Sequence, residues 1–225
     1  MRRVELQQRT GKRREGVDGL VNIHNEEDFN QAIQHILSEE YLDAFDDLTF
    51  LFEPLEQRKE IIDRVEGRLK NAESIKEKIV RKGIGLEQLR EEILDIIGFR
   101  IIIHFLSDIP NVIAVLRELP GLELNTRPKF EDYITNPKAT GYRSLHINAL
   151  YWQEGRDSPV PCEIQIRTTL QHAWAAKSHL LVYKDDEILE RWRKHFRILS
   201  DQLHLADEVA DLLRAELNSE TAGMT

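Results

Sequence analysis

Cysteine is almost absent from this chain, since Cys162 is the only one among 225 residues. One cysteine excludes an intramolecular disulfide and a structural zinc site built on several thiolates. It is also typical of proteins from a reducing compartment. Long apolar runs are missing as well. The best candidate, residues 96–106, is too short to cross a bilayer and contains Arg100 and His104.

The N-terminal segment has no apolar stretch of the kind found in signal peptides, because its basic start runs into polar residues. We therefore expect a cytoplasmic protein with no membrane partner. The net charge of −9 argues against nonspecific nucleic-acid binding by the whole surface. Residues 1–25 are basic with little apolar periodicity, so we interpret them as a flexible lead. A nucleic-acid or ribosome contact is the alternative.

Several common nucleotide-binding and hydrolase motifs are absent too. Gly11-Lys12 has neither the upstream glycine nor the following hydroxyl residue of a P-loop. Gly83-Ile84-Gly85 has no third glycine and follows no expected strand, which excludes a dinucleotide-binding fingerprint. The sequence contains no H-E-x-x-H zinc motif and no G-x-S-x-G nucleophile elbow.

Apolar periodicity predicts helices on both sides of a set of strands. Helical spacing runs over residues 26–51 with Asn25 as N-cap, and the β-branched segment 96–105 predicts a strand. The other expected elements are a short strand near 65–69, helices over 73–81 and 109–119, strands over 145–152 and 161–167, and helices over 169–184 and 186–218. The fold class is therefore α/β or α+β, with a central sheet flanked by helices. The long polar loop 121–141 is typical of a binding segment.

Carboxylates stand at the ends of the expected strands. Asp95 directly precedes the isoleucine-rich strand. Strand alternation places Glu163, Gln165 and Arg167 on one face of the strand 161–167. Two carboxylates from adjacent strands suit Mg²⁺ held jointly with phosphate oxygens. The same alternation also agrees with a plain solvent face.

Two further clusters combine hydroxyl, basic and aromatic side chains. Ser74 and Lys78 are four residues apart near a helix start, which indicates either an anion site or an ordinary basic surface. Tyr142 and Arg143 end the long loop. They offer a stacking face and a bidentate phosphate contact, or they simply pack over a strand start.

Four blocks within residues 65–184 resemble the synthetase domain of the RelA/SpoT family. The blocks are 67–70 with Ser74, Ile75 and Lys78; 95–100; 132–134 with 137–146; and 163–168 with 172–175. They occur in the family's order and spacing. The resemblance implies a nucleotidyltransferase-like fold, with a mixed central sheet and helical extensions at both ends. It also implies a GTP pyrophosphokinase of the stringent response, which moves pyrophosphate from ATP to the 3′-hydroxyl of GDP or GTP and yields (p)ppGpp and AMP.

The resemblance implies a role for each matched residue. Asp95 and Glu163 would be the catalytic, magnesium-binding carboxylates, with Glu163 assisting deprotonation of the acceptor hydroxyl. The residues implied to bind ATP are Arg68, Lys70, Ser74, Lys78 and Arg100, the two arginines stacking on adenine. Those implied to bind the guanine nucleotide are Lys138, Tyr142, Arg143, His146 and Gln165, with Tyr142 stacking on the base.

The chain departs from the family pattern at three places. Residues 129–132 match neither version of the loop signature that tracks acceptor preference, so GDP and GTP both stay open. Thr140 stands where asparagine is frequent, and Ser178-His179 stands where small synthetases often have a Glu-His pair.

The family's hydrolase domain has no counterpart in the sequence. We divide the chain into the lead 1–25, a synthetase domain over 26–185 with its core at 60–185, and a C-terminal helix over 186–225. By resemblance to small synthetases, that helix serves packing or assembly into a homo-oligomer, a tetramer or a dimer.

Two alternative functions stay open on the same fold. Toxic relatives transfer pyrophosphate to the 3′ end of tRNA, and the basic lead is the sequence feature that supports such an acceptor. A non-catalytic nucleotide sensor is the other alternative. The presence of both Asp95 and Glu163 disfavours it, because a pure binder has little use for two metal-binding carboxylates.

Overall fold

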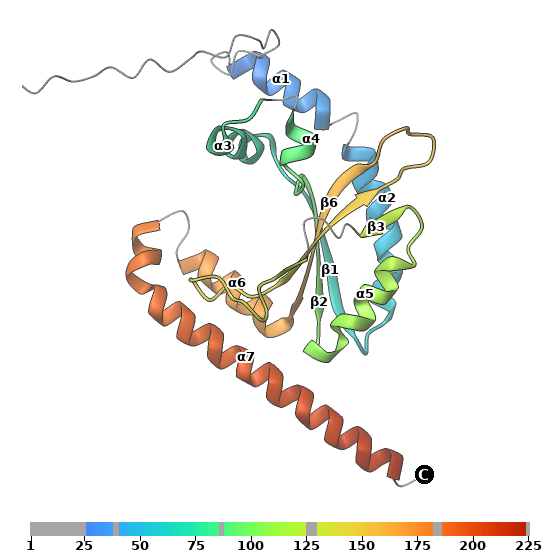
Figure 1. Ribbon diagram of the computed structural model, residues 1–225, viewed down its shortest axis with the longest axis vertical. Coiled ribbons are helices and arrows are strands. Elements are labelled where there is room, and N and C mark those ends of the chain that lie inside the picture. Colours follow the sequence, from blue (N-terminus) through green and yellow to red (C-terminus); the bar gives the residue numbers. More distant parts are fainter. Residues whose placement is uncertain (1–25, 38–40, 86–87, 125–129, 182–185, 224–225) are drawn as a thin grey trace, which may run out of the picture.

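The computed structural model describes residues 26–37, 41–85, 88–124, 130–181 and 186–223 (Figure 1). Predictions for the basic lead 1–25 with its N-cap at Asn25, and for Lys129 and Asp185, lie outside the described residues. Among the helices that are described, none is long and apolar enough to cross a membrane.

A mixed six-stranded sheet forms the centre of the described structure. Its strands are β1 (Ile62–Leu69), β2 (Ile97–Ile103), β3 (Leu122–Leu124), β4 (Glu131–Asp132), β5 (Leu145–Tyr151) and β6 (Val160–Thr168). They are arranged in the order β1-β2-β6-β5-β3, with β4 also paired to β5. Only the β2–β6 pair among these is parallel. The expected mixed α/β class is therefore confirmed.

Helices cover the sheet on both sides (Figure 1). They are α1 (Glu26–Ile36), α2 (Leu42–Phe52), α3 (Ala72–Lys82), α4 (Leu89–Glu92), α5 (Ile109–Arg117), α6 (Thr169–Leu181) and α7 (Asp186–Gly223), with short 3₁₀ turns at Glu53–Gln57 and Leu106–Asp108. Helices α2 and α5 lie on the opposite side of the sheet from α6 and α7 (Figure 1).

Strand alternation gives the sheet an apolar face and a polar face. On the apolar face, Phe99 of β2 packs against Phe45 and Phe52 of α2, with ring centroids 5.6 and 4.6 Å apart. Ile101 and Ile164 are fully buried in the same core. The residues that alternate with these along β2 and β6 point to the other face of the sheet, which carries the polar side chains discussed below.

The helix expected over 26–51 is instead two helices, α1 and α2. Each half buries a separate apolar stripe with i, i+4 spacing. Phe29 and Ile33 of α1 are buried on the side of α3, whereas Ala44 and Leu48 of α2 are buried on the side of β1. The two halves therefore pack on different elements, and the chain forms two helices in place of one.

Local signals explain the elements that hold the site. The Asn71 side chain caps α3 by accepting from the backbone N–H of Ser74 at 2.9 Å. Gly83 ends that helix with a left-handed φ of 65°. The expected strand near 65–69 is longer than predicted, because β1 pairs with β2 along its whole length. The loop 121–141 contains the short strands β3 and β4, which have no clear alternation.

Candidate active site

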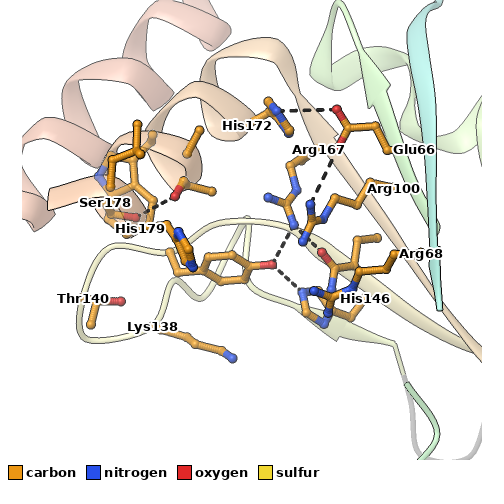
Figure 2. Close-up of a pocket in the computed structure, with 16 residues that line it drawn as sticks. Glu66, Arg68, Arg100, Lys138, Thr140, His146, Arg167, His172, Ser178 and His179 are labelled. Atoms are coloured by element: carbon orange, nitrogen blue, oxygen red, sulfur yellow. Dashed lines mark hydrogen bonds and ion pairs between the residues drawn. The ribbon is translucent and has the colours of Figure 1, made fainter. Parts of the chain in front are cut away.

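An open cleft of about 970 Å³ lies on the polar face of the sheet (Figure 2). From the sheet and the neighbouring loop, it is lined by Glu66, Arg68, Arg100, Lys138, Thr140, Tyr142, His146, Gln165 and Arg167. From α6, it is lined by His172, Trp174, Ala175, Ala176, Ser178, His179 and Leu180. The cleft thus unites six residues that the sequence predicted for two separate nucleotides: Arg68, Arg100, Lys138, Tyr142, His146 and Gln165.

The register of the strands aligns these side chains in a row. Glu66 of β1 is opposite Arg100 of β2, Arg100 is opposite Gln165 of β6, and Gln165 is opposite His146 of β5. Residues in register on adjacent strands point to the same face of a sheet. Four strands therefore each contribute one polar side chain to a continuous strip along the floor of the cleft.

Two arginines mark the β1 side of the cleft. Arg68 lies across Gly98, where an added Cβ would stand 3.5 Å from its Nε atom. Arg100 has its Nη1 atom 3.7 Å from Oε2 of Glu66. The same glutamate has Oε1 at 3.8 Å from Nε2 of His172 in α6 (Figure 2). The guanidinium groups of Arg68 and Arg100 and the carboxylate of Glu66 are all planar, and all three residues line the cleft.

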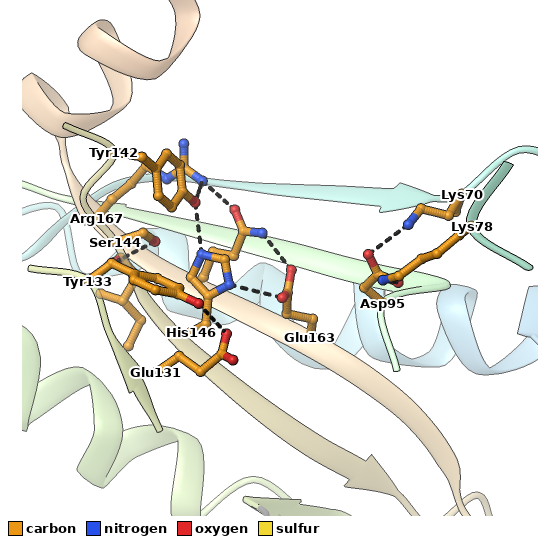
Figure 3. A network of polar contacts seen from close by, with 12 residues as sticks. Lys70, Lys78, Asp95, Glu131, Tyr133, Tyr142, Ser144, His146, Glu163 and Arg167 are labelled. Atoms are coloured by element: carbon orange, nitrogen blue, oxygen red, sulfur yellow. Dashed lines mark hydrogen bonds and ion pairs between the residues drawn. The ribbon is translucent and has the colours of Figure 1, made fainter. Parts of the chain in front are cut away.

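A closed hydrogen-bond ring occupies the β5–β6 side (Figure 3). Glu163 Oε1 is 2.9 Å from His146 Nδ1, and His146 Nε2 is 2.8 Å from the Tyr142 hydroxyl. Arg167 donates to that hydroxyl at 3.1 Å and also to Gln165 Oε1. Gln165 Nε2 completes the ring by donating to Glu163 Oε2 at 2.5 Å. Two chains of hydrogen bonds therefore run from Arg167 to Glu163. One passes through Tyr142 and His146 to Oε1, and the other passes through Gln165 to Oε2.

The ring keeps Glu163 ionised although it is largely buried. Burial acts to raise the pKa of Glu163, but hydrogen bonds and charge from His146 and the hydrogen bond from Gln165 hold it below its ordinary value. Burial also raises the pKa of Tyr142, so its hydroxyl stays protonated. The ionised form of Glu163 is the one that can accept a proton from a bound hydroxyl group.

A second charged cluster stands where β1 ends and β2 begins (Figure 3). Asp95 accepts from Lys70 at 2.6 Å and from Lys78 at 2.7 Å. Burial acts to raise the pKa of Asp95, but these two lysines hold it below its ordinary value. Ser74 lies half-buried in the first turn of the same helix that carries Lys78. Two ammonium groups beside a helix start favour a polyphosphate.

The two proposed metal ligands, Asp95 and Glu163, face the same end of the sheet. Gly98, which follows Asp95 by three residues, is opposite Glu163 in the pairing of β2 with β6. The negative charge of Asp95 acts to raise the pKa of Glu163. No group of three or more candidate ligand side chains occurs in the described part of the chain. Two carboxylates suit Mg²⁺, which normally completes its shell with water and phosphate oxygens.

Arg143 is the predicted guanine-nucleotide ligand whose side chain the structure directs away from the cleft. Its guanidinium donates to the carbonyl of Ile134 and, at 2.8 Å, to Asp201 of α7. The residue is buried, and it does not line the cleft. Lys138 does line it, with its Nζ atom 4.4 Å from the centroid of the Tyr133 ring and 5.2 Å from that of Tyr142.

Comparison with known proteins identifies the family. A family model described as "Region found in RelA / SpoT proteins" matches residues 67–188, more than half of the chain. GTP pyrophosphokinase YwaC of Bacillus subtilis (strain 168) is 39% identical over 156 residues, which cover 68% of this chain and 70% of that protein. The chain belongs to the RelA/SpoT family. GTP pyrophosphokinase YjbM of the same organism is 34% identical over 167 residues, covering 73% and 77%.

Solved structures of small alarmone synthetases resemble this RelA/SpoT chain in fold. Small alarmone synthetase 1 from Bacillus subtilis, bound to its product pppGpp, has a TM-score of 0.70 and 28% identity, covering 84% of this chain and 99% of that one. Small alarmone synthetase 2 from the same organism has a TM-score of 0.66 and 32% identity, covering 83% and 97%. The predicted family and fold class are both confirmed.

Some residues that line the cleft were not assigned a role from the sequence motifs. Glu66 stands one position before the matched region, and it was not among the predicted site residues. Arg167 and His172 lie inside matched blocks, but the motifs assigned them no role. The alternation of Glu163, Gln165 and Arg167 was the signal that pointed to Arg167. No sequence signal distinguished Glu66 from the other polar residues of its strand.

Proposed function

We propose that the chain is a GTP pyrophosphokinase, which transfers the β,γ-pyrophosphate of ATP to the 3′-hydroxyl of GDP or GTP. The observation that carries the proposal is the arrangement of the cleft. It has paired arginines at one side, the ring that ends on Glu163 at the other, and the Asp95 cluster beside it. Its relatives named GTP pyrophosphokinase, and the small alarmone synthetase 1 structure bound to pppGpp, support this reaction.

The donor half of the proposal uses the β1 side of the cleft. Arg68 and Arg100 stack on adenine, since guanidinium planes bind aromatic faces. Lys70, Ser74 and Lys78 bind the phosphates beside the start of α3. A structure of small alarmone synthetase 1 from Bacillus subtilis bound to AMPCPP, with a TM-score of 0.62, supports the donor half. Its 27% identity covers 84% of this chain and 98% of that one.

The acceptor half uses the opposite side. Tyr142 stacks on guanine, with Lys138, His146 and Gln165 around the nucleotide. Arg143 leaves this set, because its guanidinium is already bound to Ile134 and Asp201. The GDP or GTP preference stays part of the experiment below.

In the proposed reaction, the acceptor 3′-oxygen attacks the β-phosphorus of ATP in line. The new bond joins this oxygen to the β-phosphorus, and the bond from the β-phosphorus to the α,β-bridging oxygen breaks, releasing AMP. Glu163 takes the hydroxyl proton on its carboxylate. Asp95 and Glu163 would hold Mg²⁺, which supplies neutralisation of phosphate charge. The lysines of the Asp95 cluster add positive charge at the phosphates.

The organisation of the chain belongs to the same proposal. A synthetase domain over 26–185, with its core at 60–185, is followed by the segment 186–225 that contains α7. Assembly into a homo-oligomer is supported by an exposed apolar stripe on α7 formed by Leu205, Val209, Leu212, Leu213 and Leu217. A cytoplasmic location is supported by the single free thiol of Cys162.

The decisive experiment incubates the protein with γ-labelled ATP, Mg²⁺ and one acceptor at a time: GMP, GDP, GTP, ADP or tRNA. We expect label in GDP or GTP and one AMP released per product. ADP release would indicate transfer of a single phosphate and contradict the proposal. Label on tRNA alone would support the tRNA acceptor. Saturable nucleotide binding without any transfer would support the sensor.

A further inference from the structure

We propose that helix α7 positions the acceptor loop 138–143, through Ser200 and Asp201. The inference rests on the proposed function, because it assigns these two residues to the binding of the guanine nucleotide. Neither residue lines the cleft. Both lie beyond the region that matches the RelA/SpoT family model, and no sequence motif pointed to them. Three contacts carry the inference.

The first contact joins Ser200 to Gly141. The buried Ser200 hydroxyl donates to the carbonyl oxygen of Gly141. Gly141 has a φ of +94°, and a Cβ atom there would stand 2.9 Å from Cβ of Ser200 and 3.0 Å from Cα of Arg197. The loop backbone therefore packs directly on α7, and only glycine allows this approach.

The second contact joins Asp201 to Arg143. One nitrogen of the Arg143 guanidinium binds Asp201 at 2.8 Å, and another binds the carbonyl of Ile134 in the turn after β4. The Arg143 side chain is only 9% exposed, so solvent screens this ion pair less than a surface pair. Arg143 thus connects α7 to two loop segments that flank Tyr133 and Tyr142.

The third contact joins Phe196, about one helical turn before Ser200 on α7, to helix α6 on the opposite wall of the cleft. Trp174 of α6 donates from Nε1 to the backbone carbonyl of Phe196 at 2.9 Å. The Trp174 ring meets the Tyr142 ring edge-on, with centroids 6.5 Å apart. Residues 196–201 consequently hold both the loop and α6. Tyr142 stands between Gly141 and Arg143 in the chain, so α7 fixes the residue on each side of it.

The far end of α7 provides a matched control. Asp211 accepts from the Ser107 hydroxyl at 2.5 Å and from its backbone N–H at 3.2 Å. This contact likewise joins a carboxylate of α7 to the sheet domain, but Asp211 is half-buried and the contact lies at the turn after β2, away from the acceptor loop. If α7 contributed only to stability, removal of the Asp201 carboxylate and removal of the Asp211 carboxylate would change the KM values of the two nucleotides to the same extent.

The experiment compares Asp201→Ala and Ser200→Ala with Asp211→Ala in the full chain. We expect the first two to raise the KM of the guanine nucleotide about ten-fold while the KM of ATP changes by less than about two-fold. Asp211→Ala should leave both constants within about two-fold. Asp201→Asn keeps an acceptor for Arg143 and should restore most of the acceptor KM. Equal changes in both KM values, or the same change in Asp211→Ala, would overturn the inference.

Amide hydrogen exchange of residues 138–144 gives a readout that needs no activity. We expect faster exchange in Asp201→Ala and Ser200→Ala than in the unmodified chain, and no change in Asp211→Ala. Unchanged exchange in all three variants would refute the positioning role even if the kinetics differed. Lack of transfer by the unmodified chain would refute the proposed function instead, and the exchange data would still decide whether α7 holds the loop.

Discussion

His146 and Glu163 form a hydrogen-bonded pair, with Nδ1 of the imidazole 2.9 Å from Oε1 of the carboxylate. Because an ionised carboxylate only accepts, the imidazole carries a proton on Nδ1. Its Nε2 atom is hydrogen-bonded to the Tyr142 hydroxyl, 2.8 Å away. The orientation of Glu163 and the position of the Tyr142 ring are therefore linked through one histidine.

Removing the charge of Glu163 should stop the reaction without unfolding the protein. We expect Glu163→Gln to lower kcat by about 10²- to 10⁴-fold, since the glutamine cannot accept the acceptor proton. Steady-state AMP release measures kcat, and thermal melting checks the fold. Glu131→Gln is the control, because the Glu131 carboxylate is exposed and binds the Tyr133 hydroxyl. Unchanged turnover in Glu163→Gln would remove Glu163 from the mechanism.

The Tyr142 ring and its hydroxyl have separable effects. Tyr142→Phe keeps the ring and removes the group between His146 and Arg167. We expect kcat to fall about three- to ten-fold, the value of one hydrogen bond, with little change in the KM of the guanine nucleotide. Tyr142→Ala also removes the stacking face and should raise that KM at least about ten-fold. A large KM change in Tyr142→Phe would contradict this division.

The Asp95 cluster should determine the magnesium requirement. Chelation of Mg²⁺ with EDTA is expected to abolish transfer, and added Mg²⁺ to restore it. Asp95→Asn should raise the Mg²⁺ concentration for half-maximal rate by at least about ten-fold, because one carboxylate ligand is lost. Asp63→Asn in β1 is the comparison, since Asp63 pairs with the neighbouring Arg64 outside the cleft. An equal Mg²⁺ requirement in both variants would contradict the assignment of Asp95.

The buried Asp207 makes stability depend on pH. Burial raises its pKa to about 6, against the hydrogen bond from Thr168 and with a further increase from Asp211. The folded state holds this proton more tightly than the unfolded chain. The proton bound to Asp207 therefore stabilises the folded state fully below about pH 4, and this stabilisation is lost as the pH rises through 6.

Asp207→Asn keeps an acceptor for Thr168 and removes the charge. We expect a melting temperature about 2–4 °C higher than that of the unmodified chain at pH 7.5, with the difference vanishing toward pH 4. Differential scanning calorimetry across this range measures both values. A difference that is independent of pH would show that Asp207 is not the titrating group.

The strands of the site could be predicted because alternation is a local property. Glu163, Gln165 and Arg167 alternate with the buried Cys162, Ile164 and Ile166 along β6, and the structure places the polar set on one face as predicted. The position of Asp95 before β2 followed in the same way from the start of an isoleucine-rich run.

Contacts that depend on register or on distant elements could not be predicted. Glu66 joins the site because β1 pairs with β2 in one register, which no pattern in β1 specifies. Arg143 follows a tyrosine of the cleft, so a nucleotide contact was the natural prediction. Its actual partner, Asp201, stands 58 positions further along the chain. The direction of a loop side chain depends on such tertiary partners.

The two faces of the sheet also determine which property a substitution in β2 affects. Substitutions at Phe99 or Ile101 alter the core, whereas substitutions at the adjacent Gly98 or Arg100 alter the cleft. Residues that follow one another along β2 therefore affect different properties of the molecule: a change at Phe99 or Ile101 acts on the packing of the core, and a change at Arg100 acts on the shape and charge of the cleft.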